Sequence, residues 1–219
     1  MDVLVVGAHG KIGSHIVEKL QNDSTHTVTA MVRKEEQVAE FKDKGIKTLL
    51  ADLEDPLEKL EEAVEGMDAV VFSAGSGGST GADKTLLIDL DGAVKMAEAA
   101  KNKNVDRFVL VSALGADNRD KWVSSMKPYY VAKYYADRSV KEIDINYTII
   151  RPGMLTDEEG TSKVRMEETI TFKEDDNKEV PRADVAEVIV SSLDNEHTYR
   201  KSFDLVSGKT SVNDALNSL

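Results

Sequence analysis

The chain has 219 residues, of which 31% are charged and 41% hydrophobic, a composition typical of a folded globular protein and not of a disordered one. It contains no cysteine, which excludes disulfide bonds, thiolate metal sites and a cysteine nucleophile. The formal net charge is −12 and no basic stretch is evident, so we expect no nucleic-acid partner. No segment approaches the roughly 20 apolar residues of a membrane span, and the start lacks a signal-peptide pattern. We therefore expect a cytoplasmic protein with no membrane partner.

Short apolar strands alternate with amphipathic helices along the chain. The first half is predicted to contain, in order, a strand at 3–6, a helix at 11–22, a strand at 27–32, a helix at 35–44, a strand at 47–51, a helix at 56–65 and a strand at 69–72. A loop rich in glycine and serine follows at 73–82. The second half is predicted to contain a helix at 84–103, a strand at 107–111, a loop at 112–127, a helix at 128–143, a strand at 146–150, irregular or short β structure at 164–172, a helix at 182–193, a strand at 202–206 and a short helix at 213–219.

This order of elements predicts the fold class. Strands that are apolar throughout, rather than alternating, indicate a parallel sheet whose two faces are both covered by helices. We expect an α/β protein with a doubly wound, Rossmann-type sheet of about seven strands. No linker or repeat divides the chain, so we expect one domain over residues 1–219, with a small substrate-side region at 153–219.

Three glycines mark the first strand-to-helix turn, in the stretch VLVVGAHGKIGSHIVEKL. Gly7 would make the tight turn, Gly10 would allow a pyrophosphate to approach the backbone, and Gly13 would let the helix pack on the sheet. The helix N-terminus would add a field that favours the negative charge of that pyrophosphate. The alternative is a plain strand-to-helix turn, but the position after the first strand of an α/β alternation favours nucleotide binding.

The glycine spacing, together with five later motifs, resembles the short-chain dehydrogenase/reductase superfamily in its extended and atypical branches. The motifs are GAHGKIG at 7–13, ADL at 51–53, FSAG at 72–75, YYVAK at 129–133, RPG at 151–153 and RADVAEVI at 182–189. The chain length looks closer to the small atypical members, such as NmrA-like proteins and the flavin/biliverdin-IX-beta reductase type. The resemblance implies a nicotinamide dinucleotide cofactor.

The resemblance also implies which residues contact that cofactor. Asp52 would meet the adenine edge, the segment with Ala74 and Gly75 would pass under the ribose, and Pro152 would lie near the nicotinamide end. The full set of implied cofactor-binding residues is Gly7, His9, Gly10, Lys11, Ile12, Gly13, Arg33, Asp52, Leu53, Ala74, Gly75, Lys133, Pro152 and Gly153. His9 would face either solvent or the pyrophosphate. The four histidines form no ligand pair of recognisable spacing, so we expect no metal site.

The end of the second strand bears on which dinucleotide binds. An acidic residue there would hydrogen-bond the 2′-hydroxyl of NAD and repel a 2′-phosphate. The sequence instead reads AMVRKEE, with Val32 at about that place and Arg33 next. A guanidinium can bind a phosphate through two hydrogen bonds and can stack on adenine. NADP(H) is therefore favoured over NAD(H), unless Arg33 is only a surface residue that begins the next helix.

Tyr129 and Lys133 carry the predicted chemistry. They are four residues apart and therefore share one face of a helix. In the superfamily the lysine holds the nicotinamide ribose and lowers the pKa of the tyrosine, which acts as acid or base at the substrate carbonyl. Because PYYVAKYYAD holds four tyrosines, simple packing is the alternative. Ser112 is the candidate third member of the site. In many relatives the serine comes one or two positions later, so Ser112 is alternatively a structural residue at the strand end.

These observations favour an NADP(H)-dependent oxidoreductase that transfers a hydride to or from a small carbonyl or similar substrate. One alternative is a regulatory protein of the NmrA-like kind, which senses NADP(H) without turnover. Another is an NAD-dependent sugar-nucleotide epimerase or dehydratase, although the segment after Arg151 is short for a sugar-nucleotide pocket. A monomer or a homodimer is expected.

Overall fold

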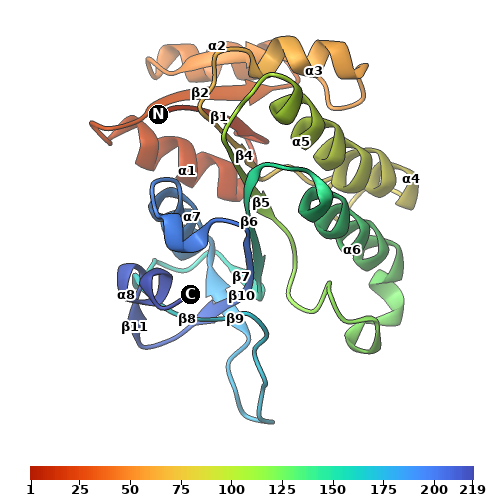
Figure 1. Ribbon diagram of the computed structural model, residues 1–219, viewed down its shortest axis with the longest axis vertical. Coiled ribbons are helices and arrows are strands. Elements are labelled where there is room, and N and C mark those ends of the chain that lie inside the picture. The colour runs from red at the N-terminus through yellow and green to blue at the C-terminus, as the bar shows by residue number, and fades with distance from the viewer.

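The computed structural model describes residues 1–219 and consists of one large sheet between two layers of helices (Figure 1). The sheet has nine strands. Their spatial order is β11 (Thr210–Ser211), β8 (Lys163–Glu167), β10 (Lys201–Ser207), β6 (Asn146–Pro152), β5 (Arg107–Val111), β4 (Ala69–Phe72), β1 (Asp2–Val6), β2 (Thr27–Val32) and β3 (Lys47–Leu50). The seven strands from β10 to β3 pair in parallel, and these are the seven predicted strands.

The prediction of about seven strands is corrected to nine, because two antiparallel strands extend one edge of the sheet. Strand β8 pairs with β10 and β11 pairs with β8. A separate two-stranded sheet joins β7 (Met154–Thr156) to β9 (Glu179–Pro181). The C-terminal third of the chain therefore contains more β structure than the sequence indicated.

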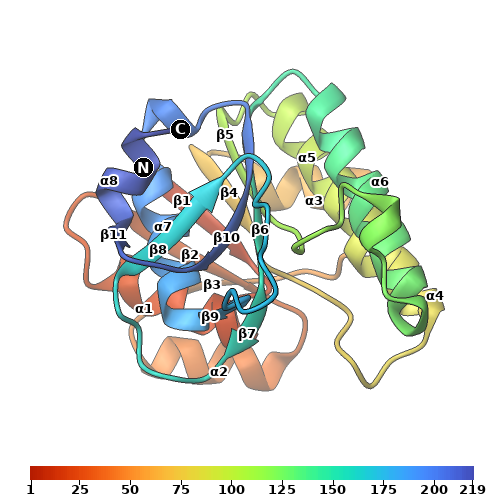
Figure 2. The same cartoon turned by 90° about the horizontal axis from the view of Figure 1, so that it is seen from below.

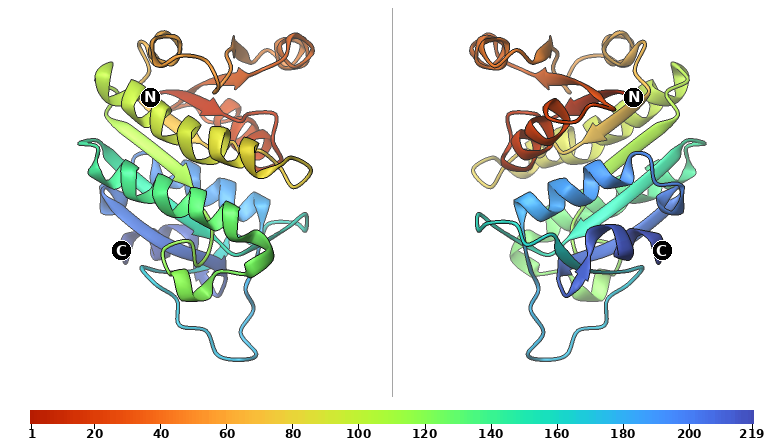
Figure 3. Two further views of the ribbon diagram at one scale, coloured as in Figure 1. Left: turned by 90° about the vertical axis from the view of Figure 1, so that its right-hand side faces the viewer. Right: turned by 90° about the vertical axis from the view of Figure 1, so that its left-hand side faces the viewer.

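Helices cover both faces of the sheet, as predicted (Figure 2). The helices of the molecule are α1 (Lys11–Gln21), α2 (Glu35–Asp43), α3 (Leu57–Val64), α4 (Ala82–Lys84), α5 (Ala93–Asn102), α6 (Lys127–Glu142), α7 (Arg182–Ser192) and α8 (Val212–Asn217). Figure 3 shows α5 and α6 side by side on one face, and α1 and α7 side by side on the other. No helix is long and apolar enough to cross a membrane.

Each face of the sheet has its own hydrophobic core. Successive strand residues point to opposite faces, so Val3 and Val5 belong to a cluster of 30 buried residues under α1 and α7. Leu4 and Val6 belong to a cluster of 22 buried residues under α3, α5 and α6. Burial on both faces is the reason that the strands are apolar throughout.

Two predicted segments differ in detail from the structure. The helix predicted at 84–103 begins earlier, at Ala82, and its first turns form a π-helix, η1 (Thr85–Gly92), before α5. The loop predicted at 112–127 contains two 3₁₀ turns, η2 (Arg119–Lys121) and η3 (Ser124–Met126). A third 3₁₀ turn, η4 (Glu196–Thr198), precedes β10. A π-helix has one more residue in each hydrogen-bonded turn than an α-helix. The pattern of hydrophobic residues in the sequence does not predict it.

A candidate dinucleotide site

The predicted site residues follow the C-terminal ends of parallel strands. Gly7 directly follows β1, Arg33 follows β2, Ser112 follows β5 and Gly153 follows β6, and Ala74 lies two residues after the end of β4. The chain leaves β1 in one direction to β2 and returns on its other side to β4, so the strand order reverses beside β1. The edge outside such a reversal is where open α/β sheets bind their ligands.

The glycine turn requires its glycines. Gly7 has φ +80°, and a Cβ there would lie 2.7 Å from the backbone of Ala74. A Cβ on Gly13 would lie 2.2 Å from the Gly7 carbonyl oxygen, so only glycine lets α1 start so close to the turn. Gly10 caps α1 in an extended conformation, without a side chain in front of the helix N-terminus. The first turn of α1 therefore presents backbone N–H groups to a ligand.

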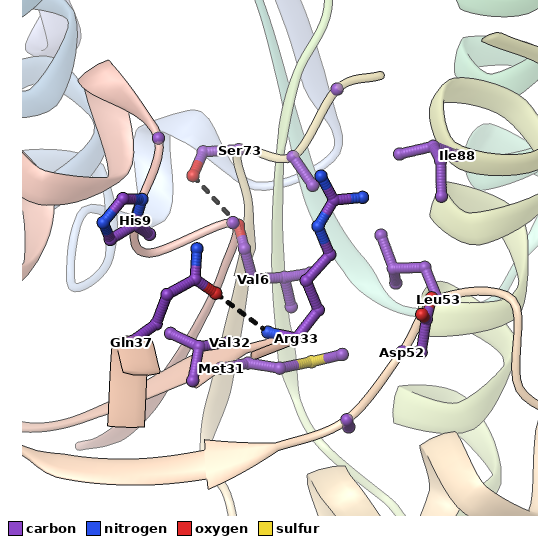
Figure 4. Close-up of a pocket in the computed structure, with 15 residues that line it drawn as sticks. Val6, His9, Met31, Val32, Arg33, Gln37, Asp52, Leu53, Ser73 and Ile88 are labelled. Atoms are coloured by element: carbon purple, nitrogen blue, oxygen red, sulfur yellow. Dashed lines mark hydrogen bonds between the residues drawn. The ribbon is translucent and has the colours of Figure 1, made fainter. Parts of the chain in front are cut away.

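A cavity of about 250 Å³ opens beside this turn (Figure 4). Eight of the predicted cofactor-binding residues line it, namely Gly7, His9, Gly10, Arg33, Asp52, Leu53, Ala74 and Gly75. The sequence reasoning missed other lining residues, among them Met31, Gln37 and Ile88. Met31, Leu53 and Ile88 give the cavity apolar lining that suits a planar ring.

Arg33 occupies the middle of this cavity. Its side chain rises from the end of β2 between His9 and Leu53, as Figure 4 shows. Its backbone N–H donates a hydrogen bond of 3.3 Å to the Gln37 Oε1, which fixes the start of α2, but its guanidinium group makes no ion pair. Val32, at the end of β2, is buried, so no carboxylate stands where one would select a ribose 2′-hydroxyl.

The Asp52 carboxylate is partly engaged within its own turn. Its Oδ1 accepts a hydrogen bond of 3.0 Å from the Glu54 backbone N–H, and its own N–H donates to Asp55 Oδ2 at 3.3 Å. Leu53 is buried against Gly92, where a Cβ would lie 3.2 Å from the leucine Cβ. The turn is therefore fixed before any ligand arrives.

The remaining predicted cofactor residues lie outside this cavity. Ile12 is buried in the core, so only its backbone faces the turn. Pro152 is buried at the end of β6. The fold itself requires a glycine at position 153, because a Cβ there would lie 2.0 Å from the Lys178 carbonyl oxygen, where β9 approaches β7.

Lys133 is buried on α6 and is held by the protein itself. Its Nζ donates to the Val111 carbonyl oxygen at 3.1 Å and forms an ion pair of 3.3 Å with Asp89 Oδ1. Asp89 comes from the π-helix η1, and its other oxygen accepts a hydrogen bond of 2.9 Å from the Ser76 backbone N–H. Burial opposes the charge on Lys133, but the neighbouring Tyr129 and Asp89 raise its pKa above the usual value. The lysine therefore keeps its positive charge.

The Tyr129 side chain lies one turn before Lys133, with the ammonium 5.7 Å from the ring centroid. Burial raises the pKa of Tyr129 above its ordinary value, although Lys133 acts in the opposite direction. The phenol is therefore protonated at neutral pH and can donate a proton. The other tyrosines of this helix belong to an aromatic cluster in which Tyr130 stacks on Trp122 at 6.1 Å, which is a packing role.

Ser112 lies below this pair and away from solvent. Its hydroxyl is buried beside the Asp137 carboxylate without completing a hydrogen bond. Asp137 receives a hydrogen bond of 3.0 Å from Arg151 Nε, and burial raises its pKa despite that guanidinium. Tyr129, Lys133 and Asp137 are spaced by four residues and form one stripe of α6. The structure brings the Ser112 hydroxyl to Asp137, the last residue of that stripe.

The sequence analysis did not single out Asp89 or Asp137. Asp137 could have been found from its spacing of four residues after Lys133. Asp89 had no such signal, because the π-helix decides which way it points. No group of three or more histidine or acidic side chains is arranged to hold a metal ion.

Three comparisons with known proteins show which proteins this chain is similar to. A family model described as NAD(P)H-binding matches residues 7–196. The Bacillus subtilis protein YhfK, named an uncharacterized sugar epimerase, is 46% identical over 219 residues, covering 100% of both chains. A Bacillus halodurans structure, named as a candidate NAD-dependent epimerase/dehydratase, matches with a TM-score of 0.92 at 40% identity over 100% of both chains. The Lactococcus lactis oxidoreductase ylbE matches with a TM-score of 0.87 at 32% identity, over 100% of this chain and 96% of that one.

Proposed function

Because the chain belongs to the NAD(P)H-binding family, we propose that it is an oxidoreductase that uses NADP(H) and reduces a small carbonyl or similar acceptor. The names of its relatives place it in a group of NAD(P)-binding proteins that includes oxidoreductases and epimerases. The observation that carries the proposal is the position of the buried Lys133, which is ion-paired with Asp89, beside Tyr129 on one face of α6. Burying a lysine costs free energy even when a carboxylate pairs with it, so its burial beside a tyrosine supports a functional role.

The residues around the cavity fit such a cofactor. Gly7 and Gly10 leave the backbone of the turn open to a pyrophosphate, and the walls of Leu53 and Ile88 suit an adenine ring. The free guanidinium of Arg33 suits a 2′-phosphate, which supports NADP(H) over NAD(H). Lys133 uses two of its three N–H groups within the protein, which leaves one for a ribose hydroxyl.

Tyr129 would then act as the proton donor. A bound reduced nicotinamide supplies a hydride to an electrophilic carbon. As negative charge develops on the substrate oxygen, the Tyr129 O–H bond breaks and the proton moves to that oxygen. The neighbouring Lys133 ammonium stabilises the phenolate that remains. Asp89 keeps the ammonium in place, and Ser112 takes no part in this step.

The test is turnover of NADPH by the purified protein with a panel of aldehydes, ketones, quinones and flavins. Tyr129→Phe should lower turnover by about a hundredfold or more, the range of a lost general acid, with NADPH affinity little changed. Tyr130→Phe is the matched control, because Tyr130 packs on Trp122, and it should retain turnover. Full turnover by Tyr129→Phe would rule out the proton-donor role.

The names of YhfK and the Bacillus halodurans protein favour a second candidate, an NAD-dependent epimerase. An epimerase returns the hydride to its substrate, so it would show no net consumption of NADPH and would retain cofactor through purification. A third candidate, sensing of NADP(H) without turnover, is favoured by the burial of Ser112 away from solvent. Unequal affinities for NADP and NADPH with no turnover on any acceptor would support sensing.

A further inference from the structure

Both basic side chains of the glycine turn are held by carboxylates from other parts of the chain. His9 Nε2 lies 3.2 Å from Glu40 Oε2 on α2. Lys11 Nζ, at the first residue of α1, lies 2.5 Å from Asp157 Oδ2, in the segment that follows β7. The turn that would receive a pyrophosphate therefore already has anionic groups on its two basic residues.

Asp157 also binds a second cation. Its Oδ1 accepts a hydrogen bond of 2.5 Å from Arg182 NH1. Lys11 is the first residue of α1 and Arg182 is the first residue of α7, so this one carboxylate joins the side chains that begin two neighbouring helices. The hydrogen bond from Lys11 leads the effects that lower the pKa of Asp157, with Arg182 adding to them. The carboxylate is thus ionised and bound through both oxygens.

The segment that carries Asp157 is attached to α7, not to α1. Asp184, buried in the first turn of α7, accepts hydrogen bonds of 3.1 Å from the Thr161 backbone N–H and of 2.9 Å from the Ser162 backbone N–H. Arg182 is only 18% exposed at its side chain, whereas Lys11 is 67% exposed. Arg182 is therefore the more buried of the two cations, whereas the side chains of Lys11 and Asp157, 67% and 62% exposed, both lie at the surface, where Asp157 can leave its partners.

A carboxylate held between a lysine and an arginine resembles a bound phosphate. Phosphate oxygens accept the same charge-assisted hydrogen bonds, and the pyrophosphate of a dinucleotide carries two negative charges, one on each phosphate, against the single charge of Asp157. Lys11 directly follows Gly10, which lines the cavity, and Asp157 joins Lys11 to Arg182, so the two cations meet beside the glycine turn that would receive a pyrophosphate.

We propose that Lys11 and Arg182 form a binding site for a ligand phosphate, and that Asp157 occupies this site until the ligand displaces it. The proposal rests on the proposed function for its source of phosphate, the pyrophosphate of the dinucleotide. A phosphate carried by a substrate would have the same chemistry. Asp157 is then an internal competitor that lowers cofactor affinity and links cofactor binding to the substrate-side segment.

The first test measures the dissociation constant of NADPH from the quenching of Trp122 fluorescence, at low and at high salt. Asp157→Asn should bind NADPH roughly five-fold more tightly than wild type, the scale of an exposed ion pair. Glu158→Gln is the matched control, because it removes the same charge from the next exposed position and should change affinity much less. Arg182→Gln should weaken NADPH binding by a similar factor. A gain in affinity cannot arise from a damaged fold.

A second titration distinguishes the source of the phosphate. If a substrate phosphate uses the pair, Asp157→Asn will leave NADPH affinity unchanged and will raise the affinity of the NADPH-saturated protein for UDP. If wild type binds no dinucleotide, the proposed function fails, and titration of the free protein with inorganic pyrophosphate still tests the pair. The proposal is overturned if Asp157→Asn and Glu158→Gln behave alike toward NADPH, UDP and pyrophosphate.

Discussion

The two ends of the candidate site are prepared for a ligand in opposite ways. The end around Arg33 is an open cavity whose central cation has no carboxylate partner. The end around Lys133 is closed, and its cation is paired with the buried Asp89. The first end is ready to recognise a charged group at once, whereas the second keeps its charge only through an internal pair. Within one candidate site, the cation of the open end is therefore without a carboxylate partner, and the cation of the closed end has a buried one.

Removal of the Lys133 ammonium from the closed end should have the largest effect, which is on the free energy of unfolding. Lys133→Met leaves the Asp89 carboxylate, 2% exposed, without its cation. Loss of one partner of a buried ion pair costs about 3–5 kcal/mol, so we expect the free energy of unfolding to fall by that amount in urea denaturation. The double variant with Asp89→Leu should recover most of the loss. A Lys133→Met protein as stable as wild type would show that the pair is not desolvated.

Breaking the open end should have a smaller effect, confined to affinity. Arg33→Glu should weaken NADPH binding by about ten- to a hundredfold, as expected for the loss of charged hydrogen bonds, and should leave NADH binding nearly unchanged. Lys34→Glu is the control, because Lys34 is paired with Glu36 at 3.6 Å and lies outside the cavity. Isothermal titration with both cofactors measures the difference. Equal losses in the two variants would indicate only a general charge effect.

The smallest predicted effect concerns Asp137 and the way in which the free energy of unfolding depends on pH. Burial raises the pKa of Asp137 above its ordinary value of 3.8, even with Arg151 beside it. A carboxyl whose pKa is raised in the fold stabilises the fold fully below pH 3.8, and that contribution is lost as pH rises through the folded pKa. The stability of wild type minus that of Asp137→Asn should therefore decrease with rising pH, by at most about 1.4 kcal/mol per pH unit. An increase would place the folded pKa below the ordinary one.

The parallel part of the sheet could be predicted from the sequence because local pattern and global position agree there. Strands β1, β4 and β5 are buried on both faces and are therefore apolar runs that end at turn residues. The antiparallel edge gave a weaker pattern. In β8, the buried Val164 and Met166 alternate with Lys163, Arg165 and Glu167, and the strand is fixed by its pairing with β10 rather than by its composition.

The candidate site divides in the same way. The glycines and Arg33 were predictable because each follows a strand end, where position along the chain fixes position in space. Asp157, which also binds Arg182, contacts Lys11 across a separation of 146 residues in the sequence. Local periodicity carries no information about such a contact.

The ion pair between Asp89 and Lys133 depends on the number of residues in the π-helix η1, which carries Asp89. Each residue of an α-helix turns the next side chain by about 100°, so deletion of a single residue from Thr85–Gly92 would restore α-helical winding and turn Asp89 away from Lys133. Helix α5 and its core would remain in place. Relatives that differ by one residue in this stretch could thus share the fold and the cofactor cavity while their lysine has a different partner. Length variation here would then change the partner of Lys133 without a single substitution in α6.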